Sequence, residues 1–523
     1  MIVTALPSIT ASLHGETTQG FWISASYVLS SAIFQPLFAS LSNIFGHVQI
    51  LAPSVLLFSL GALTAGLSRG YHQLLAGRIV QGVGAAGIMS LSLIAFTDVV
   101  PMKARPSSYA LLQGAYAVGL AAGPVVGGVV AEVVSWKGVF LLNLPVCFLA
   151  LAAVLPLGKG PTAKGGIGQK MKRIDWVGAG LLIASLSSFL IAVSRTGNER
   201  SRWFGLQALV PLLAGLGGLV LMWGWERSGV VQEPILRPAT WYWQTGRIAY
   251  LCAIVQGFLL YTQLHYIPLY FLAIPGSSPT SSGMHLLPLL FALLAASVAA
   301  SNAIMRTNRY QRILAAGLAL VTLTCGIATQ LDLTGNTTSA GLRDGLLLLN
   351  GVGHGCILNS LNLTPLANAH SSTEQAGGDG LAHAAAAYSF LRALGTCLAI
   401  CICGPVFETL LLHRLTQFQL PAPIAQHSIE FAIQLQTLPD SWVSKRQVKI
   451  SYLYSLRGVF GLLAAGAGIA LLEECEYEGG AEGDAGDSKT PRTPDARFDR
   501  LPKSPTAEWN WRPQGPVEER PRS

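Results

Sequence analysis

The sequence predicts an all-α polytopic membrane protein, on three observations. The chain of 523 residues is 51% hydrophobic and only 11% charged, whereas about a quarter of the residues in a soluble domain carry charge. Windows of about 20 apolar residues, enough for a helix to cross a bilayer core of about 30 Å, recur along most of the chain. Lys and Arg lie between these windows, so the net charge of +8 indicates membrane topology and no nucleic-acid partner.

The N-terminal half, residues 1–157, is expected to carry five complete spans and one incomplete one. Residues 1–13 are too few to cross a bilayer alone, so we expect a truncated first helix. The complete spans are predicted at residues 22–41, 50–68, 74–96, 108–130 and 138–157.

Residues 158–246 are predicted to form a charged cytoplasmic loop followed by two central helices, at 176–193 and 204–225. The C-terminal half, residues 247–472, then contains spans at 247–272, 283–305, 311–330, 342–366, 381–406 and 453–472. From residue 473 the chain becomes rich in Gly, Pro and charge, which predicts a disordered cytoplasmic tail over residues 473–523.

The distribution of basic residues sets the orientation, because cytoplasmic loops carry the excess of Lys and Arg. The loops between alternate spans are the richer ones, for example residues 158–173, and we place them inside. Asn336 begins an Asn-Thr-Thr triplet, a glycosylation acceptor, in a loop that this topology places outside. Such triplets also arise by chance.

A glycine-rich segment within residues 108–130 carries the most informative pattern. Its glycines recur every four residues, which lays them along one helix face and lets a neighbouring backbone approach closely. A proline within it favours a kink, because it removes a backbone donor. The residues are Gly119, Gly123, Pro124, Gly127 and Gly128. Ordinary packing of small residues is the alternative interpretation.

A second pattern lies in the span 74–96, where Arg78 is followed by Gln81 and Gly82. An unpaired guanidinium is costly in hydrocarbon, so Arg78 is expected to face the bundle interior or water, and is a functional candidate. Gln81 lies on the same helix face. The alternative places Arg78 near a helix end, with its side chain extended to the membrane interface.

A third segment, residues 41–47, contains Asn43, Gly46 and His47 after the span 22–41. Together these patterns resemble the major facilitator superfamily, in particular its fourteen-helix drug:proton antiporter branch, which includes fungal multidrug and toxin efflux pumps. Lys137 stands where the family's W-R-x-x-F-x-x-N-x-P run has Arg. Asn43 and His47 stand where the family carries Asp and Arg, so the loop motif is degenerate here.

The resemblance implies two six-helix halves with two extra central helices, and alternating access to a site near the bilayer midplane. It also implies proton-coupled efflux of hydrophobic drugs, toxins or secondary metabolites, with Arg78, Gln81 and Gly82 in proton coupling or gating. The expected partners are therefore a hydrophobic small molecule, protons and the lipid bilayer. A proton-coupled importer of the same fold and a non-transporting derivative are the alternatives. We expect the plasma membrane as the location, with vacuolar or other endomembranes as alternatives.

The sequence gives no support to enzymatic chemistry or to a cofactor. We find no phosphate-binding loop, no nucleophile elbow and no set of His and Cys with metal-ligand spacing. Three histidines within spans, His265, His285 and His354, each have two readings. A buried histidine could carry a proton during transport, but a hydrogen bond across helices is the more common role.

Overall fold

The computed structural model describes the chain at positions 9, 12, 13 and 235 and over fourteen ranges, within which every regular element is a helix. The ranges are 17–99, 114–116, 118–119, 122–123, 125–130, 133–157, 167–195, 205–228, 244–307, 309–330, 340–371, 379–426, 428–438 and 443–487. Two compact units divide the chain, Met1–Cys475 and Glu476–Ser523. All the sites discussed below lie in the first unit.

The N-terminal half is helical in its described part. Its helices are α2 (Thr17–Phe45), α3 (His47–Gly66), α4 (Tyr71–Val99), α6 (Trp136–Leu141) and α7 (Asn143–Val154), followed by the short helix η2 (Leu155–Leu157). Both α2 and α3 pack against α4, and α6 and α7 pack against α3. Glycines allow this close approach: a Cβ atom added at Gly61 of α3 would overlap the backbone of Gln81 in α4.

The central segment contributes α8 (Ile167–Lys172), α9 (Trp176–Arg195) and α10 (Leu206–Arg227). Helices α9 and α10 form a pair, in which the Ser188 hydroxyl donates to the Pro211 carbonyl at 2.8 Å. Helix α9 also contacts α2, so the pair is attached to the N-terminal half through α9.

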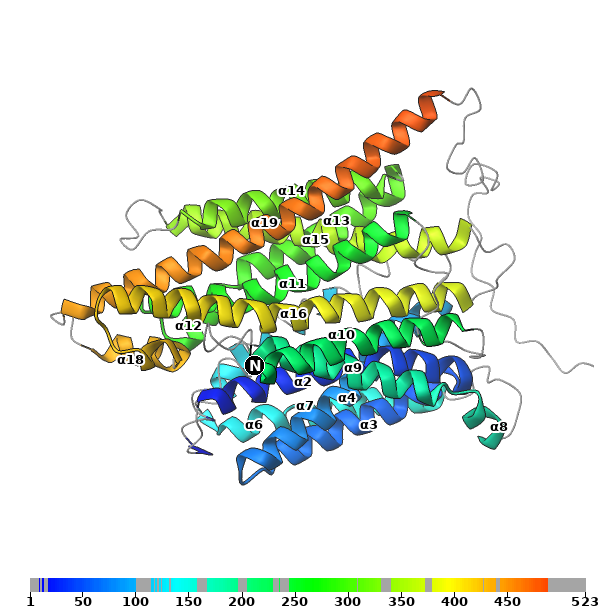
Figure 1. The fold of residues 1–523 in the computed structure, drawn as a ribbon, viewed down its shortest axis with the longest axis horizontal. Coiled ribbons are helices and arrows are strands. Elements are labelled where there is room, and N and C mark those ends of the chain that lie inside the picture. The colour runs from blue at the N-terminus through cyan, green and yellow to red at the C-terminus, as the bar shows by residue number, and fades with distance from the viewer. Residues whose placement is uncertain are drawn as a thin grey trace, which may run out of the picture. The chain divides into compact units, whose positions relative to one another are not determined.

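The C-terminal half is built from long helices. These are α11 (Gln244–Ala273), α12 (Pro279–Met284), α13 (Leu287–Thr307), α14 (Tyr310–Ala328), α15 (Ala340–Ser371), α16 (Asp379–Gln417), α17 (Pro423–Gln426), α18 (Ser428–Thr437) and α19 (Val443–Asp487). Figure 1 shows α16, in yellow, between α11 and the pair α9 and α10. Helix α16 contacts α11 on one side and α2, α4 and α9 on the other, so it joins the two halves.

Most of the predicted spans coincide with helices. Among the described residues, 11 helices are long and apolar enough to cross a membrane. The predicted span 342–366 lies within α15, and the predicted span 108–130 is described only in part. Residues 1–8 and 488–523, which include most of the expected stub and tail, lie outside the described residues.

Two helix boundaries differ from those expected. The loop expected at residues 42–49 is reduced to Gly46, whose φ of 102° and ψ of 143° are readily available only to glycine. Helix α19 continues beyond residue 472 to Asp487. In both places a hydropathy window ends where the residues become polar, whereas helical backbone hydrogen bonds continue through polar residues such as Asn43 in α2 and Glu473 in α19.

Candidate functional site

Arg78 lies two turns into α4 and is buried between helices of the N-terminal half, with 5% of its surface exposed. Its Nε atom donates to the Ile23 carbonyl of α2 at 3.1 Å, and its Nη1 atom donates to Oε1 of Gln81 at 2.6 Å. The guanidinium carbon lies 4.3 Å from the ring centre of Tyr27 and 5.8 Å from that of Phe140. This burial excludes the alternative in which the side chain extends to the membrane interface.

The environment of Arg78 is polar and aromatic, and the groups that accept its two hydrogen bonds are neutral. A carbonyl and an amide satisfy donors without cancelling the charge, and the two aromatic faces add a cation–π attraction. Arg78 is therefore a fixed positive charge held by dipoles and ring faces. Such an arrangement is sensitive to any charge that enters the same region, because the effective dielectric constant there is low.

Gly82 follows Gln81 on α4 and fixes the distance to α2. A Cβ atom at this position would overlap the Ser30 hydroxyl and approach the Tyr27 carbonyl at 2.5 Å. Since Tyr27 also covers the guanidinium of Arg78, the close contact at Gly82 keeps the ring in place. Arg78, Gln81 and Gly82 therefore form one structural unit with α2.

The degenerate loop motif forms the turn between α2 and α3. Gly46 provides the positive φ, and the Nδ1 atom of His47 lies 3.0 Å from the hydroxyl of Ser42. Asn43 is half-buried near the end of α2. In this turn, Asn43 and His47 stand where the family resemblance implies a charged Asp and Arg pair, and His47 contacts the Ser42 hydroxyl.

The glycines of the antiporter-like segment do not share one environment. Gly123, Gly127 and Gly128 are buried, and a Cβ atom at Gly128 would meet the Thr280 hydroxyl at an ordinary 3.4 Å. Gly119 is exposed, and no atom of the described residues lies within 4 Å of a Cβ atom added there. Within the described part of the chain, the expected close backbone approach is therefore absent at Gly119. Pro124 and Asn336 lie outside the described residues.

A polar network in the C-terminal half connects α11 to α15 and α14. His354, fully buried in α15, places Nε2 at 2.8 Å from Oε1 of Gln263 and Nδ1 at 3.0 Å from Nε2 of Gln256. Gln263 donates to Sγ of Cys325 at 3.1 Å, and Asn350 donates to the Thr324 hydroxyl at 2.7 Å. His354 thus makes hydrogen bonds across helices, the more common of its two predicted roles.

Gln256, Gln263 and Asn350 were not among the candidate residues predicted from the sequence. Spacing was the signal that could have found them, because Gln256 and Gln263 are two helical turns apart and Asn350 and His354 one turn apart. Polar residues at such intervals within an apolar span lie on one face, and that face has to meet another polar group.

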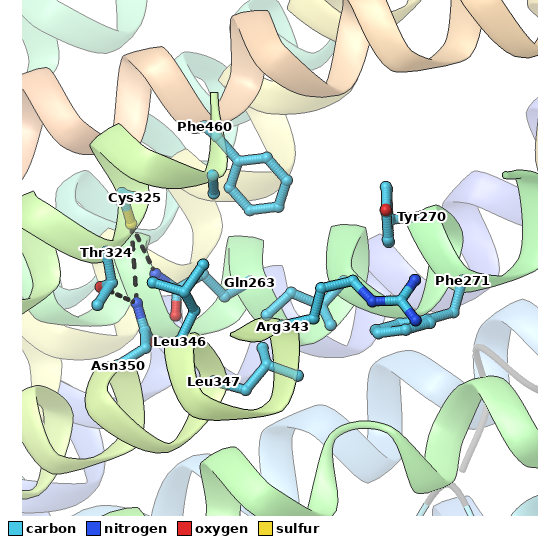
Figure 2. Close-up of a pocket in the computed structure, with 12 residues that line it drawn as sticks. Gln263, Tyr270, Phe271, Thr324, Cys325, Arg343, Leu346, Leu347, Asn350 and Phe460 are labelled. Atoms are coloured by element: carbon cyan, nitrogen blue, oxygen red, sulfur yellow. Dashed lines mark hydrogen bonds between the residues drawn. The ribbon is translucent and has the colours of Figure 1, made fainter. Parts of the chain in front are cut away.

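A pocket adjoins this network, with about 540 Å³ of free space when its open mouth is counted. Figure 2 shows Arg343, Tyr270 and Phe271 at one end of it and Asn350, Thr324 and Cys325 at the other, with Phe460 of α19 on one side. Apolar side chains line most of the remainder. A mainly apolar wall with a few polar groups is the lining typical of small-molecule sites.

The two halves meet through hydrogen bonds between α2 and α16. The Ser389 hydroxyl donates to Oε1 of Gln35 at 3.0 Å, and Sγ of Cys397 donates to the Val28 carbonyl at 3.5 Å. The Ser389 and Gln35 side chains are both buried. These bonds link residues more than 350 positions apart in the chain.

Comparison with known proteins decides the family. Residues 1–400 match the family described as Major Facilitator Superfamily. The chain belongs to the major facilitator superfamily. It is accordingly a multi-pass integral membrane transporter and not an enzyme.

Relatives in this superfamily include fungal efflux pumps. The chain is 32% identical over 416 residues to "Efflux pump FUS6" of Gibberella moniliformis, covering 79% of this chain and 71% of that protein. It is 33% identical over 412 residues to "MFS-type efflux pump LUC4" of Fusarium sp., covering 78% and 71%. "MFS transporter L2" of Phoma sp. is 30% identical over 474 residues, covering 90% and 77%.

The fold agrees with the solved structure of another transporter. A bacterial homologue of the human lysosomal transporter Spinster superposes with a TM-score of 0.55 at 14% identity, covering 91% of this chain and 92% of that one. At this identity the similarity concerns the fold alone.

Proposed function

We propose that this transporter exports hydrophobic small molecules, such as drugs, toxins or secondary metabolites, in exchange for protons across the plasma membrane. The observation that carries the direction of transport is the set of relatives named efflux pumps, matched over more than 400 residues at 32–33% identity. The resemblance of the glycine-proline segment to the antiporter motif supports the same direction.

In this proposal Arg78 acts as the fixed charge of the coupling site. A guanidinium keeps its proton at any physiological pH, so Arg78 itself does not carry the transported proton. Its positive charge, supported by Gln81 and two aromatic rings, instead favours the deprotonated state of whichever acidic group approaches it. Proton binding elsewhere in the site then weakens that attraction and changes the preferred conformation.

The contacts between α2 and α16 support an alternating-access mechanism for this chain. The hydrogen bonds from Ser389 to Gln35 and from Cys397 to Val28 involve no charged group. Interhelical hydrogen bonds within a membrane contribute about 0.6 kcal/mol on average, so one end of this contact can open at low cost. Rocking of the halves about α2 and α16 would expose a site between them to each side in turn.

The proposal is tested by dye efflux from cells that express the chain. Cells loaded with rhodamine 6G are followed with and without a protonophore, for the wild type, for Arg78→Ala and for Arg306→Ala. Arg306 is a matched control, because it is exposed at the end of α13. We expect dye efflux from cells with the wild type. The protonophore and the Arg78→Ala substitution should each abolish this efflux, and Arg306→Ala should leave it intact.

Other outcomes would contradict specific parts of the proposal. Accumulation of dye, driven by the proton gradient, would indicate an importer. Efflux that persists with the protonophore would overturn proton coupling. Correct insertion with no transport of any of a panel of hydrophobic dyes would favour a non-transporting derivative. Fluorescence microscopy of the tagged chain tests the plasma-membrane location, which vacuolar labelling would contradict.

A further inference from the structure

The cavity beside the polar network lies within the C-terminal half and contains two polar atoms that have no hydrogen-bond partner among the described residues. Its walls come from α11, α14, α15 and α19, so it is formed inside one helical bundle. Gln263, Thr324 and Cys325 in the lining are hydrogen-bonded within the network. The remaining lining is aromatic or aliphatic, including Phe271, Leu347 and Phe460. Unpartnered polar atoms in such a lining are costly, and each one indicates what a ligand would have to supply.

The first of these atoms is Nε of Arg343, a donor. Nε is buried and has no hydrogen-bond partner in the described part of the chain. The guanidinium carbon lies 5.8 Å from the ring centre of Phe271, and that ring stacks on His285 at 3.9 Å. Figure 2 shows the guanidinium at the end of the cavity formed by Tyr270 and Phe271. A positive charge with a free donor in this place favours an anionic group, preferably a planar carboxylate.

The second atom is Oδ1 of Asn350, an acceptor. The side chain has 6% of its surface exposed, and Oδ1 has no hydrogen-bond partner among the described residues. The assignment of the amide is fixed by its other end: Nδ2 donates to the hydroxyl of Thr324, which itself donates to the Leu320 carbonyl. Oδ1 therefore requires a donor, such as a hydroxyl group.

The two atoms belong to the same face of α15. Arg343 and Asn350 are seven residues apart, which is two helical turns and about 10 Å along the axis. Both line the cavity, with Leu346 and Leu347 between them. A single rigid molecule could therefore reach both ends across an apolar middle.

We infer that this cavity binds an amphipathic organic anion with an apolar, aromatic body, a carboxylate at Arg343 and a hydroxyl group at Asn350. As a binding site the cavity stands on its own geometry. As a site for an exported substrate it rests on the proposed function, which it extends by naming the substrate class.

The experiment measures binding to purified protein in nanodiscs of neutral phosphatidylcholine, with no proton gradient. The probe is 6-hydroxy-2-naphthoate, which is fluorescent and carries its two groups at opposite ends of an apolar ring system. The matched compounds are 2-naphthoate, which lacks the hydroxyl, and the methyl ester of the probe, which lacks the charge. Fluorescence polarisation gives the dissociation constants.

The wild type should bind the probe about tenfold more tightly than either matched compound, which is typical for one lost charged or buried hydrogen bond. Arg343→Gln should remove the preference for the acid over the ester. Asn350→Leu should remove the preference for the probe over 2-naphthoate and keep the preference for the probe over its methyl ester. Arg306→Gln is the matched control and should retain both preferences. Each preference is a ratio of two dissociation constants measured on the same variant. A sample that is only partly folded therefore does not change it.

Equal affinities of the wild type for the three compounds would overturn the inference. Displacement of the probe by phosphatidate in the nanodiscs at equal concentration would also overturn it, by assigning the cavity to a lipid headgroup. The efflux assay is independent of this result. Proton-dependent dye efflux without naphthoate binding would refute the binding site alone, whereas naphthoate binding without any efflux would refute the proposed export alone.

Discussion

The two halves of the molecule bury polar side chains in different ways. In the N-terminal half, Arg78 is a permanent charge held by a carbonyl, an amide and two rings. In the C-terminal half, His354 is held by two glutamine amides, a network whose members can all be neutral. A neutral network that is satisfied stabilises one arrangement of helices. A charge held only by dipoles responds to other charges, so we expect function to depend on Arg78 and stability to depend on His354.

Replacement of Arg78 is the strongest test of this contrast. Arg78→Ala should lower proton-dependent efflux at least tenfold, because the fixed charge of the coupling site is removed. Arg78→Lys keeps the charge but loses the planar fork that reaches both Ile23 and Gln81, so we expect partial activity. Transport is measured in vesicles with an imposed proton gradient. Full activity of Arg78→Ala would refute the role of this charge.

The glycine at position 82 tests whether close packing keeps Arg78 in place. Gly82→Leu forces a side chain into Ser30 and the Tyr27 carbonyl, and overpacking of this kind costs about 1–3 kcal/mol or more. We expect a lower midpoint of thermal unfolding in detergent together with reduced transport. Gly119→Leu is the matched control, because no atom that the structure describes lies within 4 Å of a Cβ atom there. A similar loss in both variants would contradict the packing argument.

The network around His354 should affect stability and leave the pH dependence of transport unchanged. His354→Leu leaves the amides of Gln256 and Gln263 without their partner, and a buried unsatisfied group costs about 1–3 kcal/mol. Thermal unfolding should show this loss, and His354→Gln should restore part of it. The pH profile of efflux should keep its midpoint. A shifted midpoint would mean that His354 carries a proton.

The smallest effect is expected at the contact between the halves. Ser389→Ala removes the hydrogen bond to Gln35, which is worth about 0.6 kcal/mol and corresponds to a change of two- to threefold in a conformational equilibrium. Accessibility of introduced cysteines on each side of the membrane measures that equilibrium. An unchanged accessibility pattern would show that this bond exists equally in both states.

Sequence periodicity and motifs predicted the helices and the resemblance to the superfamily, because apolar length and composition determine which segments can cross a membrane. It was also predictable that Arg78 and Gln81 share one helix face, since they are three residues apart. Gly119 and Gly82 show the limit of this reasoning. Both glycines lie in predicted spans next to other small residues. Which of them must lack a side chain depends on the helix that packs against it, and this is a matter of tertiary structure. The partners of Asn350 lie on another helix, so they depend on tertiary packing in the same way.

The length of α16 has a mechanical consequence. Its 39 residues extend about 58 Å, roughly twice the thickness of the hydrocarbon core. The helix is bonded to α2 at Ser389 and Cys397 and to α9 at Cys401, and Pro405 then removes one backbone donor from its hydrogen-bond ladder. Beyond Pro405 the last turns pack within the C-terminal half, where the guanidinium carbon of Arg414 lies 4.7 Å from the ring centre of Tyr454. Because Pro405 separates the two sets of contacts, a bend there would let the last turns follow the C-terminal half while the earlier turns stay with α2. A spin label near Gln417 would therefore report the rocking motion.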